Sequence, residues 1–282
     1  MPPSHYMAER IGSATLLPEG PLVAGSLATL ELVYTAGFFG VDDTGVVKIS
    51  WRTTSDFAKP QFDRPSEAGY TTVTASNGAD LEVRYDRLNI RPLLHTLFIR
   101  LKKGYLSEGD RVVVRFGDPQ AGSPGIRLQT NCEDAFTFHL HVDAFATYDF
   151  APLPRSPTLR LVAGPAQRWK AVLPTLRRSG SPFRLSLTAE DKWGNPAQAG
   201  PCRLVLAPNL PVAGLPAFVD VERLPMVLED LSLAQEGVLT VAVLANEGGL
   251  LARSNPLVSE ALAGNETYWG DLHGGGLQQR RP

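Results

Sequence analysis

Apolar and polar residues alternate with a period of two along most of this chain, and this periodicity limits the folds open to it. The alternation runs from Leu27 to Tyr34 and from Val46 to Arg52, and it recurs in LEVRYDR, LFIRLKKG, RVVVRFGD and FTFHLHVDAF. Successive side chains of a strand point to opposite faces, so the pattern is typical of strands with one buried face. No stretch longer than about ten residues keeps helical i, i+3, i+4, i+7 spacing, and 23 prolines would interrupt a helix. The sequence predicts an all-β fold.

Length and one proline-rich stretch predict how the chain divides. It has 282 residues, 43% of them hydrophobic, which is enough for two cores at about 150 residues per domain. Four prolines crowd the segment FAPLPRSPTLRLVAGPA: Pro152, Pro154, Pro157 and Pro165. Such a segment cannot join a central sheet. We therefore expect two tandem β-sandwich (immunoglobulin-like) domains, the first over 1–151 with long loops and the second over 152–265, followed by a short C-terminal tail over 266–282.

A turn in the second half has a clear stereochemical signature. The segment DKWGNP spans Asp191 to Pro196. Gly194 or Asn195 is expected to supply a positive φ, and Pro196 to prevent continuation as a paired central strand.

Charge and hydropathy limit the binding partners and the cellular location that we expect for this protein. The net charge is −2 and the isoelectric point about 6.2, which gives no electrostatic reason to expect a nucleic acid or an anionic membrane. The N-terminus shows no secretory signal. The most apolar stretch, Leu22 to Val41, contains Glu31 and alternates like a strand. We predict no nucleic-acid partner, no membrane partner and a cytoplasmic location. Cys132 and Cys202 are expected to be core or near-core thiols rather than a disulfide.

Two histidines flank one residue on a predicted strand. His139 and His141 would point to the same face, a geometry that a zinc or iron site can use. Glu133, Asp134 or Asp143 would have to supply a third ligand. The alternative is a pair of imidazoles on a solvated face of the sheet.

Acidic loop residues raise the possibility of calcium. Asp42, Asp43, Asp56 and Asp63 lie in loops, but their spacing does not resemble the alternating acidic loop that supplies about six to eight oxygen ligands. The alternative is that they are turn-forming acids.

The segment GSPG offers a possible anion site. Gly122, Gly125 and Arg127 could form a nest of backbone N–H groups beside a positive charge. No helix is expected after them to add a dipole, and the alternative is a tight turn.

The most suggestive motif lies near the end of the sequence. Asp271 and His273 in YWGDLH would project to one face of a strand. Metal hydrolases place ligands at the end of such strands, where the metal lowers the pKa of a bound water. The alternative is a frayed polar terminus.

Several segments together resemble a known family. They are GVDDTGVVKISWR, DFAKPQFDRP, GDPQAGSPGIRLQTNCEDAF, DKWGNP, ARSNPLV and YWGDLH. With these segments the chain resembles the N-terminal portion of the domain of unknown function 3604 family, predicted metal-dependent hydrolases similar to the polymerase-and-histidinol-phosphatase superfamily. The second half also resembles invasin-type bacterial immunoglobulin-like domains.

The resemblance implies a metal centre begun by Asp271 and His273, with a divalent metal as the family's cofactor. His273 would be a ligand, and Asp271 a ligand or the residue that orients one. The family continues with further ligands, whereas here GGGLQQRRP follows. Since a hydrolase metal needs about three or four protein ligands, we expect no cofactor, no catalytic residues and no activity in this chain itself.

Three hypotheses follow. The first is a non-catalytic β-sandwich front part of a predicted metal-dependent hydrolase, a docking or substrate-binding scaffold whose partner is the missing catalytic domain or a separate hydrolase chain. The second is an independent module that binds a small molecule or carbohydrate through first-domain loops around these residues: Trp51, Phe57, Phe62, Arg127 and Glu133. The third is a metallohydrolase completed by oligomerisation, in which His139 and His141 join His273.

Overall fold

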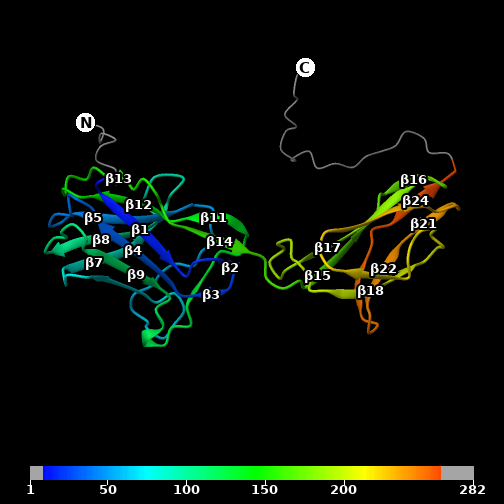
Figure 1. The fold of residues 1–282 in the computed structure, drawn as a ribbon, viewed down its shortest axis with the longest axis horizontal. Coiled ribbons are helices and arrows are strands. Elements are labelled where there is room, and N and C mark those ends of the chain that lie inside the picture. The colour runs from blue at the N-terminus through cyan, green and yellow to red at the C-terminus, as the bar shows by residue number, and fades with distance from the viewer. Residues whose placement is uncertain (1–8, 262–282) are drawn as a thin grey trace, which may run out of the picture. The chain divides into compact units, whose positions relative to one another are not determined.

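The computed structural model describes residues 9–261, and strands make up almost all of its regular structure (Figure 1). Within these residues the one helix is a 3-10 turn, η1 (Pro119–Ala121). The predicted all-β class is therefore confirmed. The chain divides into two compact units, Met1–Gly164 and Pro165–Pro282.

The observed boundary lies later than the predicted one at 151/152. The proline-rich segment belongs to the first unit, because it contains β14 (Thr158–Val162), which pairs with β11 (Glu133–Thr137) and with β2 (Pro21–Val23). Leu159 and Leu161 of β14 are buried in the first unit's core. The predicted tail, 266–282, lies outside the described residues.

Two large antiparallel sheets form the first unit. The four-stranded sheet has the order β1 (Gly12–Leu17), β4 (Leu30–Ala36), β9 (Arg111–Phe116), β6 (Thr71–Ala75). The five-stranded sheet has the order β13 (Ala151–Pro152), β12 (His139–Asp143), β5 (Val46–Trp51), β8 (His95–Lys103), β7 (Asp80–Asp86). A two-stranded pair, β10 (Ile126–Arg127) with β3 (Leu27–Ala28), and the β11–β14–β2 sheet complete it.

Alternation along the strands produces the first core. Leu30, Leu32 and Tyr34 of β4 are fully buried, as are Ile49 and Trp51 of β5. They belong to one hydrophobic cluster that both large sheets share. The unit is therefore a sandwich whose inner faces are the apolar halves of the period-two pattern.

The predicted strand from Leu27 to Tyr34 is interrupted. Thr29 separates β3 from β4, and its hydroxyl donates to the carbonyl oxygen of Gly117 at 2.9 Å. The short strand before this residue then pairs with β10, whereas β4 pairs with β1 and β9.

Three sheets build the second unit around a separate core. Their orders are β15 (Arg168–Val172), β17 (Phe183–Glu190), β20 (Met226–Leu231); β16 (Leu176–Arg178), β24 (Leu257–Glu260), β21 (Gly237–Leu239); and β19 (Phe218–Val221), β18 (Cys202–Pro208), β22 (Val241–Ala245), β23 (Leu250–Arg253). Pairing is antiparallel except between β16 and β24. This unit is the expected immunoglobulin-like sandwich.

The DKWGNP turn has the predicted geometry. Gly194, rather than Asn195, supplies the positive φ, at 92°. The buried carboxylate of Asp191 accepts hydrogen bonds from the backbone N–H of Trp193 at 2.8 Å and of Asn195 at 3.0 Å. The acid therefore organises the turn from inside the fold.

Candidate functional site

Asp271 and His273 lie outside the described residues, so their role as metal ligands stays a prediction.

The histidine pair lies side by side on β12. His139 is opposite Ser50, and His141 is opposite Lys48, so both imidazoles share the outer face of the five-stranded sheet. Burial lowers the pKa of both rings; the positive charge of Arg52 lowers that of His139 further, and His139 and Lys48 do the same to His141. Both rings are therefore neutral at pH 7, the form in which imidazole ligates metals.

The acids proposed as a third ligand have other contacts. Glu133 accepts hydrogen bonds from Arg52 at 2.6 Å and from the Gln129 amide at 2.8 Å. Asp143 is buried, and its carboxylate accepts from the backbone N–H of Thr147 at 2.9 Å and of Tyr148 at 2.8 Å. Across residues 9–261, no group of three or more His, Cys, Asp or Glu is arranged to hold a metal ion.

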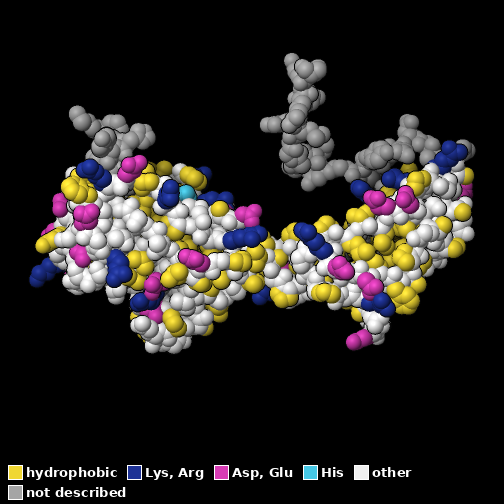
Figure 2. All heavy atoms as spheres, viewed as in Figure 1, with side chains coloured by type: hydrophobic (Ala, Val, Ile, Leu, Met, Phe, Trp, Pro, Cys, Tyr) yellow, Lys and Arg dark blue, Asp and Glu magenta, His cyan; other side chains and the backbone are white. Residues whose placement is uncertain are grey.

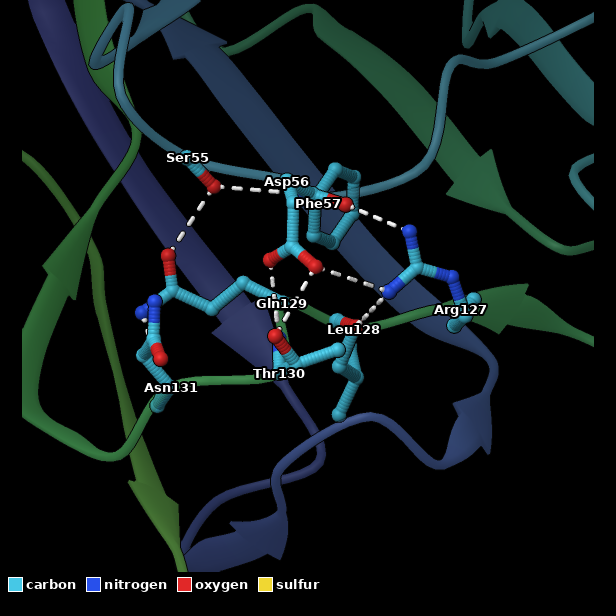
Figure 3. Close-up of polar contacts among 8 residues, drawn as sticks. All are labelled: Ser55, Asp56, Phe57, Arg127, Leu128, Gln129, Thr130 and Asn131. Atoms are coloured by element: carbon cyan, nitrogen blue, oxygen red, sulfur yellow. Dashed lines mark hydrogen bonds and ion pairs between the residues drawn. The ribbon is translucent and has the colours of Figure 1, made fainter. Parts of the chain in front are cut away.

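Asp56, in the loop between β5 and β6, contacts β10 and the connection from β10 to β11 (Figure 3). One carboxylate oxygen accepts the backbone N–H of Thr130 at 2.8 Å, and the other accepts the Thr130 hydroxyl at 2.9 Å and the Arg127 guanidinium at 3.2 Å. Arg127 also donates to the backbone carbonyl of Asp56 at 2.7 Å. We call Asp56, Arg127 and Thr130 the loop clamp.

Neighbouring contacts extend the clamp. The Ser55 hydroxyl donates to the side-chain oxygen of Gln129 at 2.9 Å and accepts the backbone N–H of Phe57 at 3.0 Å. Burial raises the pKa of Asp56, but hydrogen bonds from Thr130 and Arg127, together with the guanidinium charge, outweigh it and leave this pKa below its ordinary value. The ionised carboxylate is therefore the form that the clamp stabilises.

Of the aromatic residues around which ligand binding was proposed, two are buried and one is exposed. Trp51 and Phe57 are buried core residues whose rings meet edge to face, so neither ring is exposed to a ligand, and binding through the loops around them stays a prediction. Their aromatic character reflects packing with Phe116 and Phe138. Phe62 is exposed.

The GSPG segment is a turn after η1. The backbone N–H of Gly122 donates to the carbonyl of Pro119 at 2.9 Å, and that of Gly125 donates to the Ser123 hydroxyl at 3.3 Å. Both N–H groups are thus used within the turn, and Arg127 serves the clamp. Of the acids considered for calcium, Asp56 also serves the clamp, and Asp42, Asp43 and Asp63 lie in exposed turns.

The second unit contains a cavity that the sequence analysis did not predict. It measures about 470 Å³, within the roughly 300–1,000 Å³ range of small-molecule sites. Six of its lining residues come from β15, from β18 and from the β22–β23 hairpin: Trp169, Cys202, Leu204, Asn246, Glu247 and Leu251. The available signal was Trp169, a large amphipathic side chain on an edge strand.

The cysteines differ from expectation in one case. Cys132 is exposed rather than a core thiol, whereas Cys202 is half-buried at the rim of this cavity. Burial raises the pKa of the Cys202 thiol, which favours the protonated, less nucleophilic form at neutral pH.

Comparisons with known proteins identify similar structures but no family. No family model and no curated protein matches the chain. Among solved structures, the D00-D0 domain of intimin is 8% identical, covering 88% of this chain and 100% of that one with a TM-score of 0.33. The integrin-binding protein invasin is 12% identical, covering 88% and 60% with a TM-score of 0.28. The adhesin InvE of Yersinia pseudotuberculosis is 10% identical, covering 88% and 58% with a TM-score of 0.26.

These neighbours are of the type that the second half resembles in sequence. Their identities and TM-scores are too low to transfer a function, and the immunoglobulin-like class rests on this chain's own sheets. No finding links the chain to the domain of unknown function 3604 family or to a hydrolase. In residues 9–261, no helix is long and apolar enough to cross a membrane.

Proposed function

We propose that the chain is a non-catalytic β-sandwich scaffold. The loop clamp is the observation that supports this role. Its charged groups satisfy each other, so the two loop regions are braced against the sandwich rather than left open for chemistry. A braced pair of loops is suited to holding another body in a fixed position.

The resemblance at YWGDLH motivates the finer proposal. In it, the two units are the front part of a metal-dependent hydrolase of the domain of unknown function 3604 type, and they dock the catalytic part or its substrate. Asp271 and His273 would then contribute to a centre whose other ligands come from elsewhere, since two protein ligands do not hold a catalytic metal.

Metal analysis of the purified chain tests the scaffold proposal. We expect less than stoichiometric zinc, manganese or iron, with the same content in His273→Ala. One metal per chain, lost in His273→Ala and in His139→Ala, would overturn the proposal and favour a site completed by oligomerisation.

A second candidate is a small-molecule binding module, and the cavity beside Trp169 favours it. Trp169, Leu204 and Leu251 offer apolar surface, and Asn246 and Glu247 offer polar groups. Few polar groups in an apolar hollow are the usual composition of such sites.

A thermal-shift screen of small molecules tests this candidate. A ligand that raises the melting temperature should lose its effect in Trp169→Ala and keep it in Trp193→Ala, an exposed tryptophan away from the cavity lining. Equal loss in both variants, or no stabilising compound, would count against the cavity as a binding site.

A further inference from the structure

Three loops meet at one end of the first unit's sandwich. They cover residues 37–45, 104–110 and 144–150, which leave or enter the two large sheets. Val41 and Leu106 exchange backbone hydrogen bonds of 2.9 and 2.8 Å, and the backbone N–H of Asp42 donates to the carbonyl of Ala144 at 2.8 Å. The loops therefore form one connected surface.

Exposed aromatic side chains lie in all three loops, with Tyr105 of the 104–110 loop 63% exposed. Phe38 is 60% exposed, Phe145 40% and Tyr148 73%. Half-buried Phe39 stands edge to face between Phe38 and Phe145, with ring centroids 5.4 Å from each. Figure 2 shows hydrophobic and charged side chains interspersed at this left-hand end of the first unit. We call this surface the aromatic end.

The backbone at the aromatic end is held in an unfavourable conformation. Thr44, Ala146 and Tyr148 have φ values of 68°, 52° and 62°, and Asp230 is the one other non-glycine residue with positive φ between residues 9 and 261. Such residues persist where their surroundings enforce them, and they cluster at functional sites. Here the enforcing group is the buried carboxylate of Asp143, which accepts the backbone N–H groups of Thr147 and Tyr148.

The charged groups around the aromatic rings limit the chemical class of ligand that this surface can bind. Asp42, Asp43 and Asp149 are exposed, and none forms an ion pair with another described residue. The guanidinium of Arg10 lies 5.1 Å from the Phe38 ring centre. Glu108 of the 104–110 loop is a fourth exposed carboxylate, and the Lys48 ammonium lies 3.4 Å from the Phe150 ring centre. Four exposed carboxylates against these two cations disfavour an anionic lipid surface. They suit a ligand that donates hydrogen bonds and also offers apolar faces.

We propose that the aromatic end binds a neutral polysaccharide chain. The C–H face of a sugar ring is apolar and slightly positive, so it packs against the negative face of an aromatic ring. Sugar hydroxyls donate charge-assisted hydrogen bonds to carboxylates such as Asp42, Asp43 and Asp149. Because Phe38, Phe145 and Tyr148 protrude, they contact a chain that lies across the end. This deepens the binding-module proposal on a surface separate from the Trp169 cavity.

Retention on insoluble cellulose, chitin and curdlan tests the proposal with the full chain. Wild-type protein should bind at least one of these neutral polysaccharides. A triple variant, Phe38→Ala with Phe145→Ala and Tyr148→Ala, should bind at least about tenfold more weakly, since stacking on each ring contributes to affinity. Phe218→Ala removes an aromatic side chain of similar exposure, 57%, from β19 of the second unit and should bind like wild type.

Further measurements separate the alternatives. The triple variant should keep a cooperative unfolding transition near that of wild type. If it is unstable, the three single variants replace it, and each should lose part of the polysaccharide binding. Binding should change less than about twofold between about 0.05 and 0.5 M NaCl, because the ligand is uncharged. A steep fall with salt would instead indicate a cationic partner and overturn the proposal. The proposal would also be overturned if wild-type protein bound none of the three polysaccharides, or if the triple variant bound as well as wild type. Neither result would bear on the Trp169 cavity.

Discussion

Asp56 joins two segments of the first unit that lie far apart in the sequence. Its two carboxylate oxygens accept three hydrogen bonds, and its carbonyl accepts a fourth. The partners lie more than seventy positions away, with separations of 71 residues to Arg127 and 74 to Thr130. A single acid therefore joins segments that local sequence patterns cannot relate.

Asp56→Ala should destabilise the protein by about 1–2 kcal/mol, because it removes the carboxylate that accepts from the Thr130 N–H and hydroxyl and pairs with Arg127, whose guanidinium keeps only backbone carbonyl acceptors. Urea unfolding measures this change. Asp63→Ala is the matched control, since Asp63 lies in a nearby exposed turn, and it should stay within about 0.5 kcal/mol of wild type. Equal effects of the two substitutions would contradict a special role for the clamp.

The same contacts predict a pH dependence. Because the pKa of folded Asp56 lies below its ordinary value of 3.8, the ionised side chain stabilises the folded state fully above that value. The stabilisation is lost as pH falls through the lower folded pKa. The difference in unfolding free energy between wild type and Asp56→Asn should thus be constant from about pH 7 to about pH 5 and shrink below about pH 4. A difference that stays constant in acid would show that the charge is unimportant.

At the scale of elements, two glycines have a positive φ, but only one of them is also in close contact with a neighbouring strand. Comparing them distinguishes the cost of backbone strain from the cost of a steric clash. Gly125 precedes β10 with φ 114°, and an added Cβ would lie 2.9 Å from the backbone N and O of Ala28. Gly20 has φ 96°, and an added Cβ would meet nothing within 4 Å. A side chain at residue 125 would therefore force Ala28 and the β10–β3 pair to shift.

Gly20→Ala should cost about 1–2 kcal/mol for the left-handed conformation alone. Gly125→Ala should cost more, because Ala28 and β3 must also shift. Chemical denaturation of both variants compares them directly. If Gly125→Ala costs no more than Gly20→Ala, the close approach of β10 to β3 is not what fixes this position.

At the scale of the whole molecule, each unit has its own hydrophobic cluster and should fold by itself. A fragment of residues 165–261 is expected to unfold cooperatively, as measured by calorimetry or urea titration. A fragment without a transition would show that the second core is not sufficient.

The boundary itself can be tested with two fragments of the first unit. Residues 1–164 should unfold cooperatively. Residues 1–151 lack β14, and losing the buried side chains of Leu159 and Leu161 should destabilise the fragment by at least about 4 kcal/mol. Equal stability of the two fragments would favour the earlier boundary that the prolines suggested.

The sequence by itself determined the class of fold and the alternation of buried and exposed side chains along the strands, because strand periodicity is local and places every second side chain on one face. It also determined the DKWGNP turn, whose geometry depends on adjacent residues. Only the tertiary structure decided the rest. The pairing of β14 with β11 and β2, the contact of Asp56 with Arg127, the burial of Trp51 and Phe57 and the exposure of Phe38, Phe145 and Tyr148 all depend on residues far apart in the chain. A local pattern shows that a side chain is aromatic or charged, but only its distant neighbours decide whether it packs, braces a loop or faces a ligand.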